Sequence, residues 1–256
     1  MILRGPCYDE SRGLRLDAYL PAGPVRAVVL YLHGGGFLKG SREEPLVQAL
    51  AARLSPQAVA VVSADYRLRV PLSAFPPQQA KEIAAMQARS VAAGLTLAPR
   101  LCGPAMIAAV QDASAALAAV RGGLVPGLQG LPVVVLGVSA GGIAGLSLAH
   151  PPKGMALARP DAVLSVAGAM VQPWRLRRAG PPCVMLHGQR DRVIGLENPA
   201  LAARRATAQG IDLRLVDSGV AGHNTQVTAL LEGRDAQGRP YFDHLLHLAL
   251  GPGATA

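Results

Sequence analysis

The pattern of apolar and polar positions divides the chain into two kinds of segment that alternate along most of its length. Short apolar runs rich in β-branched residues are expected to form buried strands, at residues 27–32, 58–64, 133–136, 162–166, 183–186 and 213–216. Segments with helical periodicity lie between and after them, at about 44–54, 78–91, 105–120, 141–149, 199–209 and 241–250. This alternation is typical of a mostly parallel sheet covered by helices on both faces, so we predict an α/β fold.

Two stretches depart from this alternation. Residues 2–8 and 14–20 are expected to pair antiparallel across a turn, and Pro21 ends the second strand. Residues 131–149 carry no charge and are long enough to suggest a membrane span. Because this stretch contains Pro132, two serines and four glycines, we interpret it as a strand, a turn and a helix.

The segment 76–103 is the third exception. Consecutive prolines open it, further prolines lie at its other end, and a helix is expected between these breakers at residues 78–91. An inserted helix of this kind can form a small lid over a site. Extra packing against the edge of the domain is an equally good interpretation, and the sequence leaves both open.

The composition indicates a globular protein with a large core. Of the 256 residues, 50% are hydrophobic and 16% are charged, and the mean hydropathy is +0.29, which excludes a disordered chain. Because α/β folds of about 250 residues often form one unit, we predict a single domain over residues 1–256. The first residues lack the apolar run of a secretory signal, so a cytoplasmic location is expected. The three cysteines lack disulfide-framework or zinc-site spacing and are expected to be free thiols.

The formal net charge of +9 raises the question of an acidic partner. The basic residues are scattered, however, and the chain has only one Trp, five Tyr and three Phe. A nucleic-acid-binding protein would cluster its basic residues and interleave aromatic ones, so no nucleic-acid partner is expected, and no stable membrane insertion either. We interpret most of the charge as solvated surface, with attraction of anionic substrates or surfaces as the alternative.

Residues 137–141 match the pattern G-x-S-x-G at the expected junction of a strand with a helix. A sharp turn there forces Ser139 into strained backbone angles, and the glycines two positions before and after it let neighbouring chain pass close by. The hydroxyl is thereby exposed, and the N–H group of Ala140 lies at the start of the helix. This is the pattern of a nucleophile elbow, and a glycine-rich turn without chemistry is the alternative.

Three consecutive glycines, at positions 34–36, follow His33 at the end of an earlier predicted strand. Without Cβ atoms, their backbone N–H groups can approach a ligand closely. Two such donors, joined by the N–H of Ala140, would form an oxyanion hole. A phosphate-binding loop is the rival interpretation, but neither G-x-G-x-x-G nor a G-K-S or G-K-T ending is present.

Two further segments lie past the ends of expected strands. The sequence HGQRD ends in Asp191, and the sequence GVAGH ends in His223. In an open parallel sheet, the loops after the carboxyl ends of the strands gather at one edge, so Ser139, Asp191 and His223 can meet there.

Several other ionisable residues are weaker candidates. Asp161 precedes a strand and therefore lies at the opposite edge of the sheet, and Asp217 lacks the HGxxD context. Asp243, His244 and His247 lie on the last expected helix without a further ligand at a known spacing, so no metal site is expected.

In its motifs the chain resembles the α/β-hydrolases. Three motifs are similar to those of hormone-sensitive-lipase-like carboxylesterases: HGGGF at 33–37, DYRL at 65–68 and GVSAGG at 137–142. The HGxxD form around Asp191 resembles dienelactone hydrolases and acetyl esterases instead. Val138 stands where the elbow of the lipase-like family commonly has an acidic residue.

The resemblance implies roles for six residues. Ser139 is implied as nucleophile, Asp191 and His223 as its triad partners, and Gly35, Gly36 and Ala140 as backbone oxyanion donors. No metal or organic cofactor is required. Three neighbouring side chains are expected to fix the loop beneath the oxyanion glycines rather than touch substrate: His33, Asp65 and Arg67.

The chain departs from the resemblance in its cap. The usual N-terminal cap has no counterpart, and only residues 167–182 separate the strands where other lipases insert a large lid. We therefore predict no large cap domain and expect the insert at about 76–103 to shape the acyl pocket.

These expectations describe a serine hydrolase that cleaves small, short-acyl carboxylic esters through an acyl-enzyme intermediate. The same residues would serve an arylformamidase, a lactonase or a peptidase, because the fold and the triad do not fix the leaving group. A non-catalytic ligand-binding protein of this fold is the alternative from another class, although such proteins commonly lose the base. The sequence leaves the oligomeric state open, with a homodimer as one option, because Cys183 and the edges of the sheet say little about partners.

Overall fold

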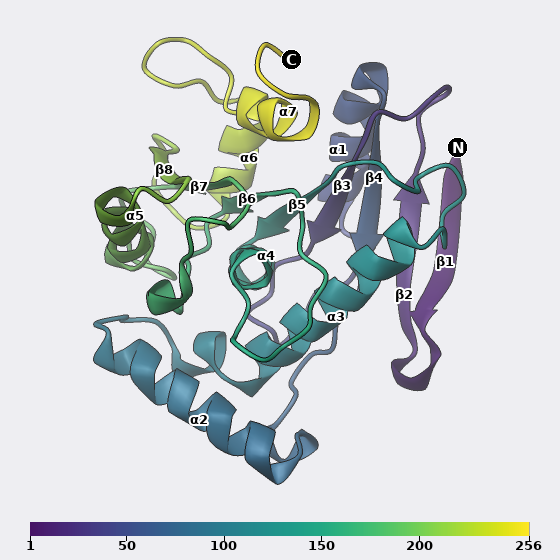
Figure 1. Ribbon diagram of the computed structural model, residues 1–256. Helices are drawn as coiled ribbons and strands as arrows, with labels where there is room; N and C mark the ends of the chain where they lie inside the picture. The colour runs from purple at the N-terminus through teal and green to yellow at the C-terminus, as the bar shows by residue number, and fades with distance from the viewer. Residues whose placement is uncertain (256) are drawn as a thin grey trace.

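The computed structural model describes residues 1–255, in which eight strands form one sheet (Figure 1). The strands are β1 (Ile2–Asp9), β2 (Leu14–Tyr19), β3 (Ala27–Leu32), β4 (Val59–Ala64), β5 (Val133–Val138), β6 (Ala162–Val166), β7 (Cys183–His187) and β8 (Leu213–Asp217). The helices are α1 (Pro45–Leu54), α2 (Pro77–Ala92), α3 (Pro104–Arg121), α4 (Ala140–Ala149), α5 (Glu197–Gln209), α6 (Thr225–Glu232) and α7 (Phe242–Leu250).

The sheet has the strand order β1-β2-β4-β3-β5-β6-β7-β8 and is antiparallel only at its first edge. β2 pairs antiparallel with both β1 and β4. The other strands, β3 to β8, all run parallel to one another. The predicted antiparallel pair, strands and helices are confirmed, with small differences at their ends, but β8 is not a buried strand, because it lies at the edge of the sheet and only Leu213 of its residues is buried. Helix α6 is not predicted, because its eight residues are too few for a clear periodic pattern and no side chain caps its start.

Alternate residues of β3 point to opposite faces of the sheet and pack into two separate cores. Val28 and Leu30 belong to the core that includes residues of α3 and α4. Val29 and Tyr31 belong to the core that includes residues of α1, α6 and α7. Helices thus cover both faces (Figure 1), and the predicted α/β architecture is confirmed.

Close backbone approach at the end of β5 explains the two flanking glycines of the G-x-S-x-G pattern. A Cβ atom on Gly137 would lie 2.2 Å from the carbonyl oxygen of Gly141, and a Cβ atom on Gly141 would lie 2.0 Å from that of Leu32 in β3. Only glycine leaves room for α4 to begin against the ends of these strands. The stretch 131–149 is therefore a strand, a turn and a helix, and no helix within the described residues is long and apolar enough to cross a membrane.

The insert at 76–103 consists of α2 and a 3-10 helix, Pro99–Cys102. The segment between these two helices is bonded to the start of α5, because the backbone N–H of Thr96 donates to Oδ1 of Asn198 at 2.9 Å. Between β6 and β7, residues 167–182 contain one short 3-10 helix, Pro173–Arg175. No large cap is inserted at that position, as predicted.

A buried arginine closes the far end of α4. The Arg175 guanidinium donates to the backbone carbonyl oxygens of His150 (2.8 Å from Nε) and Ser147 (2.9 Å from Nη2), where the helix carries partial negative charge. His150 is the residue at which the helix ends, and its Nδ1 accepts a hydrogen bond from the backbone N–H of Arg177 at 3.3 Å. Burial, and then the positive charges of the neighbouring arginines, lower the pKa of His150 to about 4.

We expect acid to destabilise the wild-type protein more than a His150→Gln variant. Histidine in an unfolded chain titrates near about 6.5, so between this pH and a folded pKa of about 4 the unfolded state binds more protons. Folding stability therefore falls as the pH drops through this window. Urea unfolding at about pH 7.5 and about pH 5 should give a loss about 2 kcal/mol smaller in the variant. An equal loss in both proteins would contradict a buried, neutral His150.

Candidate active site

Ser139 occupies the turn between β5 and α4 in a strained backbone conformation. Its φ is 53° and its ψ is −112°, a region that residues with a side chain rarely adopt. The turn is held from the side, because the backbone N–H of Ser139 donates to the carbonyl oxygen of Val166 in β6 at 2.8 Å. The strain is therefore fixed by the sheet and directs the hydroxyl toward the loops at its carboxyl edge.

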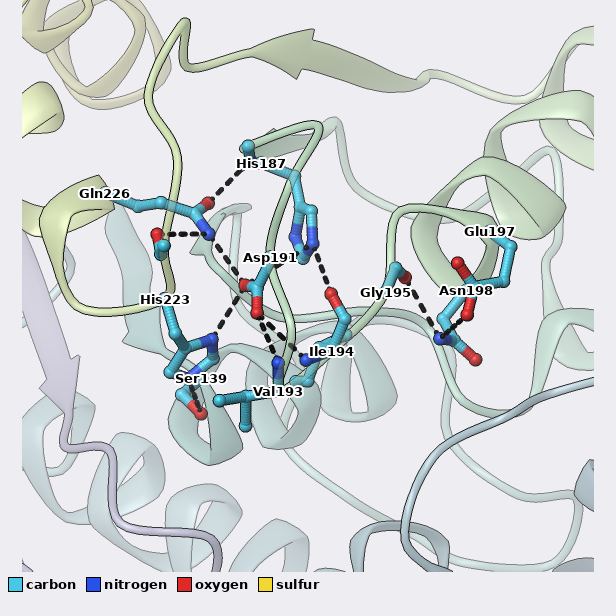
Figure 2. A network of polar contacts seen from close by, with 12 residues as sticks. Ser139, His187, Asp191, Val193, Ile194, Gly195, Glu197, Asn198, His223 and Gln226 are labelled. Carbon is cyan, nitrogen blue, oxygen red and sulfur yellow. Dashed lines mark hydrogen bonds and ion pairs between the residues drawn. The ribbon is translucent and has the colours of Figure 1, made fainter.

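Three side chains from separate loops form one hydrogen-bonded line at this edge (Figure 2). Nε2 of His223 lies 2.8 Å from Oγ of Ser139, although the two residues are 84 positions apart. Nδ1 of the same ring lies 2.7 Å from Oδ2 of Asp191. Asp191 follows β7 and His223 follows β8, so the parallel strands bring together all three residues that the sequence singles out.

The Asp191 carboxylate is saturated with hydrogen bonds. Oδ1 accepts from the backbone N–H groups of Val193 (2.8 Å) and Ile194 (3.0 Å), and Oδ2 accepts from His223. Burial raises the pKa of Asp191, but the bonds that its carboxylate accepts lower the pKa by more, so it lies below its ordinary value. An ionised carboxylate accepts a hydrogen bond from the Nδ1–H group of His223, which leaves Nε2 as the acceptor facing the Ser139 hydroxyl.

Gln226 is a further member of the network that the sequence does not reveal. Its side chain is fully buried at the start of α6; Nε2 donates to Oδ2 of Asp191 at 2.7 Å, and Oε1 accepts from the backbone N–H of Gly188 at 2.9 Å. In the sequence, Gln226 lies three positions after His223 and matches no motif, so it is expected to be a surface residue. Only its burial and its two partners distinguish it.

A second histidine lies close to Asp191 without replacing His223. Nε2 of His187 donates to the carbonyl oxygen of Ile194 at 2.8 Å and lies 3.6 Å from Oδ2 of Asp191. Burial lowers the pKa of His187, so the ring is neutral. His187 thus fixes the loop that carries Asp191.

The competing carboxylates are engaged elsewhere. Asp217 accepts from Nε2 of Gln189 at 2.5 Å and from the backbone N–H of Gly219 at 2.9 Å. Asp161 lies before β6 and accepts from Nη2 of Arg121 at 2.7 Å. Within residues 1–255, no group of three or more His, Cys, Asp and Glu side chains is arranged to hold a metal ion, including the residues on α7.

The glycine loop after β3 shares a cavity with Ser139 and His223. Gly35 has a φ of +104°, and a Cβ atom there would lie 2.0 Å from the carbonyl oxygen of Lys39, so the loop requires glycine. Gly36 also has a positive φ, of +65°. Ala140 is the first residue of α4, where a backbone N–H has no partner within the helix. Backbone donors from two segments are therefore available near the Ser139 hydroxyl.

The side chains around this loop fall into two groups. His33 bonds the loop itself, because its Nδ1 donates to the carbonyl oxygen of Gly34 at 2.7 Å, and Asp65 bonds the segment that follows the loop, because its Oδ1 accepts from the backbone N–H of Arg42 at 2.9 Å. The prediction for Arg67 is wrong. Its Nε donates to Asp112 on α3 at 2.8 Å, so this arginine anchors the DYRL segment to a helix instead.

The cavity in front of Ser139 measures about 900 Å³, a size suited to a small molecule. Its apolar lining includes Leu46, Val138 and Val227, and Leu101 of the insert contributes to the wall as well. The last turn of the insert therefore lines the cavity, whereas its role in shaping an acyl pocket and its action as a lid stay predictions.

Solved structures share this architecture. Native Est2, an esterase from Thermogutta terrifontis, is 18% identical at a TM-score of 0.66, over 97% of this chain and 94% of that chain. Its cyclosarin-phosphonylated form is 19% identical at a TM-score of 0.64 (94% and 89% covered), and its propionate-bound form is 19% identical at 0.62 (86% and 84% covered). No protein-family model matches the chain, and no curated protein matches its sequence. At this identity the likeness establishes the α/β-hydrolase-like fold of these esterases.

Proposed function

We propose that the protein is a serine hydrolase that cleaves small, short-acyl carboxylic esters through an acyl-enzyme intermediate. The observation that carries the proposal is the continuous line of hydrogen bonds from Ser139 through His223 to Asp191, which faces a cavity and a glycine loop. A hydroxyl, an imidazole and a carboxylate at these distances are the groups that nucleophilic acyl transfer requires.

In the first step, Oγ of Ser139 attacks the ester carbonyl carbon while Nε2 of His223 takes the hydroxyl proton. Asp191 keeps the imidazole in the required tautomer and stabilises its positive charge. The C–O bond to the alcohol then breaks, and the imidazolium returns its proton to the leaving alkoxide. The products of this step are a free alcohol and an acyl group esterified to Ser139.

The backbone N–H groups of Gly35, Gly36 and Ala140 stabilise the negative charge that develops on the carbonyl oxygen in this step. The proposal is supported by the shared cavity of the glycines and Ser139, and by the position of Ala140 at the start of α4. In the second step, His223 activates a water molecule, which attacks the acyl-enzyme and releases the carboxylic acid. The residues act without a metal or organic cofactor.

Two observations favour esters with short acyl chains. The cavity of about 900 Å³ has no large cap above it, and the apolar side chains in its walls are aliphatic, with the aromatic Tyr31 as the exception. The similar esterase from Thermogutta terrifontis has been solved with propionate and with butyrate bound, which supports the same substrate class for this chain.

Replacement of Ser139 by alanine should abolish ester hydrolysis while leaving the fold intact. We expect kcat/KM for 4-nitrophenyl butyrate to fall by about 10⁴- to 10⁶-fold, because the nucleophile is removed. The same measurement on 4-nitrophenyl acetate and octanoate would establish the chain-length preference. Ser11→Ala, in the exposed turn between β1 and β2, is the matched control. Near-normal turnover by Ser139→Ala would refute the assignment.

Replacement of Gln226 by methionine should slow the reaction without weakening substrate binding. The variant keeps the volume of the buried side chain but removes the donor to Asp191, so we expect kcat to fall on the order of 10-fold and KM to stay within about two-fold. Gln48→Met, on the exposed face of α1, serves as the control. A folded Gln226→Met protein with unchanged kcat would show that Gln226 only packs against the site.

A further inference from the structure

The cavity in front of Ser139 has an uneven charge that the proposed chemistry does not use. Three cationic side chains line it, those of Lys39, Arg69 and Arg100, against a single carboxylate, that of Glu44. Glu44 accepts a hydrogen bond from the hydroxyl of Tyr31 at 2.5 Å. The lining therefore carries an excess of positive charge beside the nucleophile.

Arg100 places its charged group against the glycine loop. A Cβ atom on Gly36 would lie 3.6 Å from Nε and 3.7 Å from Nη2 of Arg100, so the guanidinium lies against the backbone proposed to stabilise the oxyanion. Among the described residues, no hydrogen-bond or ion-pair partner of its side chain is found. Its donors are therefore available to a ligand.

The backbone around Arg100 is firmly placed, although its side chain is exposed. Its neighbours Leu101 and Cys102 are buried, and Nε2 of Gln87 on α2 donates to the carbonyl oxygen of Pro99 at 2.8 Å. The backbone therefore fixes where this side chain begins, at the wall of the cavity.

Arg69 is fixed to the same loop from the other side. Its backbone has a φ of 56°, and its N–H donates to the carbonyl oxygen of Phe37 at 2.9 Å, while its Nε donates to that of Leu38 at 2.9 Å. The terminal nitrogens of the guanidinium remain free for a ligand. Two arginines thus flank the glycine loop with donors that the described residues do not use.

Nearby arginines outside the cavity show the opposite arrangement. Arg42 pairs with Asp17 at 3.1 Å, and Arg67 pairs with Asp112 at 2.8 Å. Positive charge in this part of the molecule is therefore paired with buried carboxylates where it serves the fold, and it outnumbers the acidic side chains where it lines the cavity.

We propose that the preferred substrate is an anionic ester, one that carries a carboxylate in addition to the ester bond that is cleaved. This inference rests on the proposed ester hydrolysis and specifies its substrate class. The carboxylate pairs with Arg100, supported by Arg69 and Lys39, which orients the ester carbonyl toward Ser139. Attraction into a cleft lined by one sign of charge also raises the rate of encounter.

Two matched pairs of esters test this inference. The first is 4-nitrophenyl hemiadipate and its neutral terminal-amide counterpart, which place the charge on the acyl side. The second is 4-acetoxybenzoate and 4-acetoxybenzamide, which place it on the alcohol side. We expect kcat/KM to favour the anionic member of at least one pair by about 10-fold at low salt, and the preference to shrink as salt screens the cavity.

The Arg100→Gln variant should lower the anionic-to-neutral ratio of kcat/KM in that pair by about 10-fold. Arg26→Gln is the matched control, since it removes the same charge from an exposed position before β3, at the opposite edge of the sheet. No preference for an anionic member in either pair would overturn the inference, as would a preference that survives Arg100→Gln. With either of these two outcomes, the proposed ester hydrolysis still stands if the wild type cleaves the neutral esters. If the wild type cleaves none of the four esters, the proposed function fails as well.

Discussion

The hydrogen bond between Nδ1 of His223 and Oδ2 of Asp191 determines what the cavity can do chemically. It settles which ring nitrogen carries the proton, and so leaves the other nitrogen as an acceptor for the Ser139 hydroxyl. The surrounding structure serves to hold one carboxylate in place: two backbone N–H groups and the buried Gln226 bind its oxygens, and His187 fixes its loop. Without these donors, a buried carboxylate would favour its neutral form.

A second set of hydrogen bonds connects the loop that carries Asp191 to the insert at 76–103. Ile194 and Gly195 follow Asp191, Nδ2 of Asn198 donates to the carbonyl oxygen of Gly195 at 3.0 Å, and Asn198 accepts from Thr96 of the insert (Figure 2 shows the Asn198 part of this network). The segment that carries Arg100 is thus tied to the loop that carries Asp191. The proposed substrate contact of Arg100 and the placement of the Asp191 carboxylate thus depend on one connected set of hydrogen bonds, although the residues come from distant parts of the chain.

Much of this arrangement follows from local sequence. The strands are predictable, because runs of β-branched apolar residues favour them. The glycines at 137 and 141 are predictable, because the close approach of neighbouring backbone leaves no room for a Cβ atom. Gln226 is not predictable, because its importance arises from burial that only tertiary structure creates. Arg67 was misassigned for a similar reason: its partner, Asp112, lies 45 positions away on a helix that the DYRL motif does not specify.

The most direct test of the central claim is covalent labelling of the native protein with a fluorophosphonate probe, followed by peptide mapping. This chemistry reads out a serine hydroxyl activated by a neighbouring base and requires no knowledge of the substrate. The account predicts one adduct per chain, located on Ser139, and its loss when His223 is replaced by alanine. No adduct, or an adduct on another serine, would contradict it.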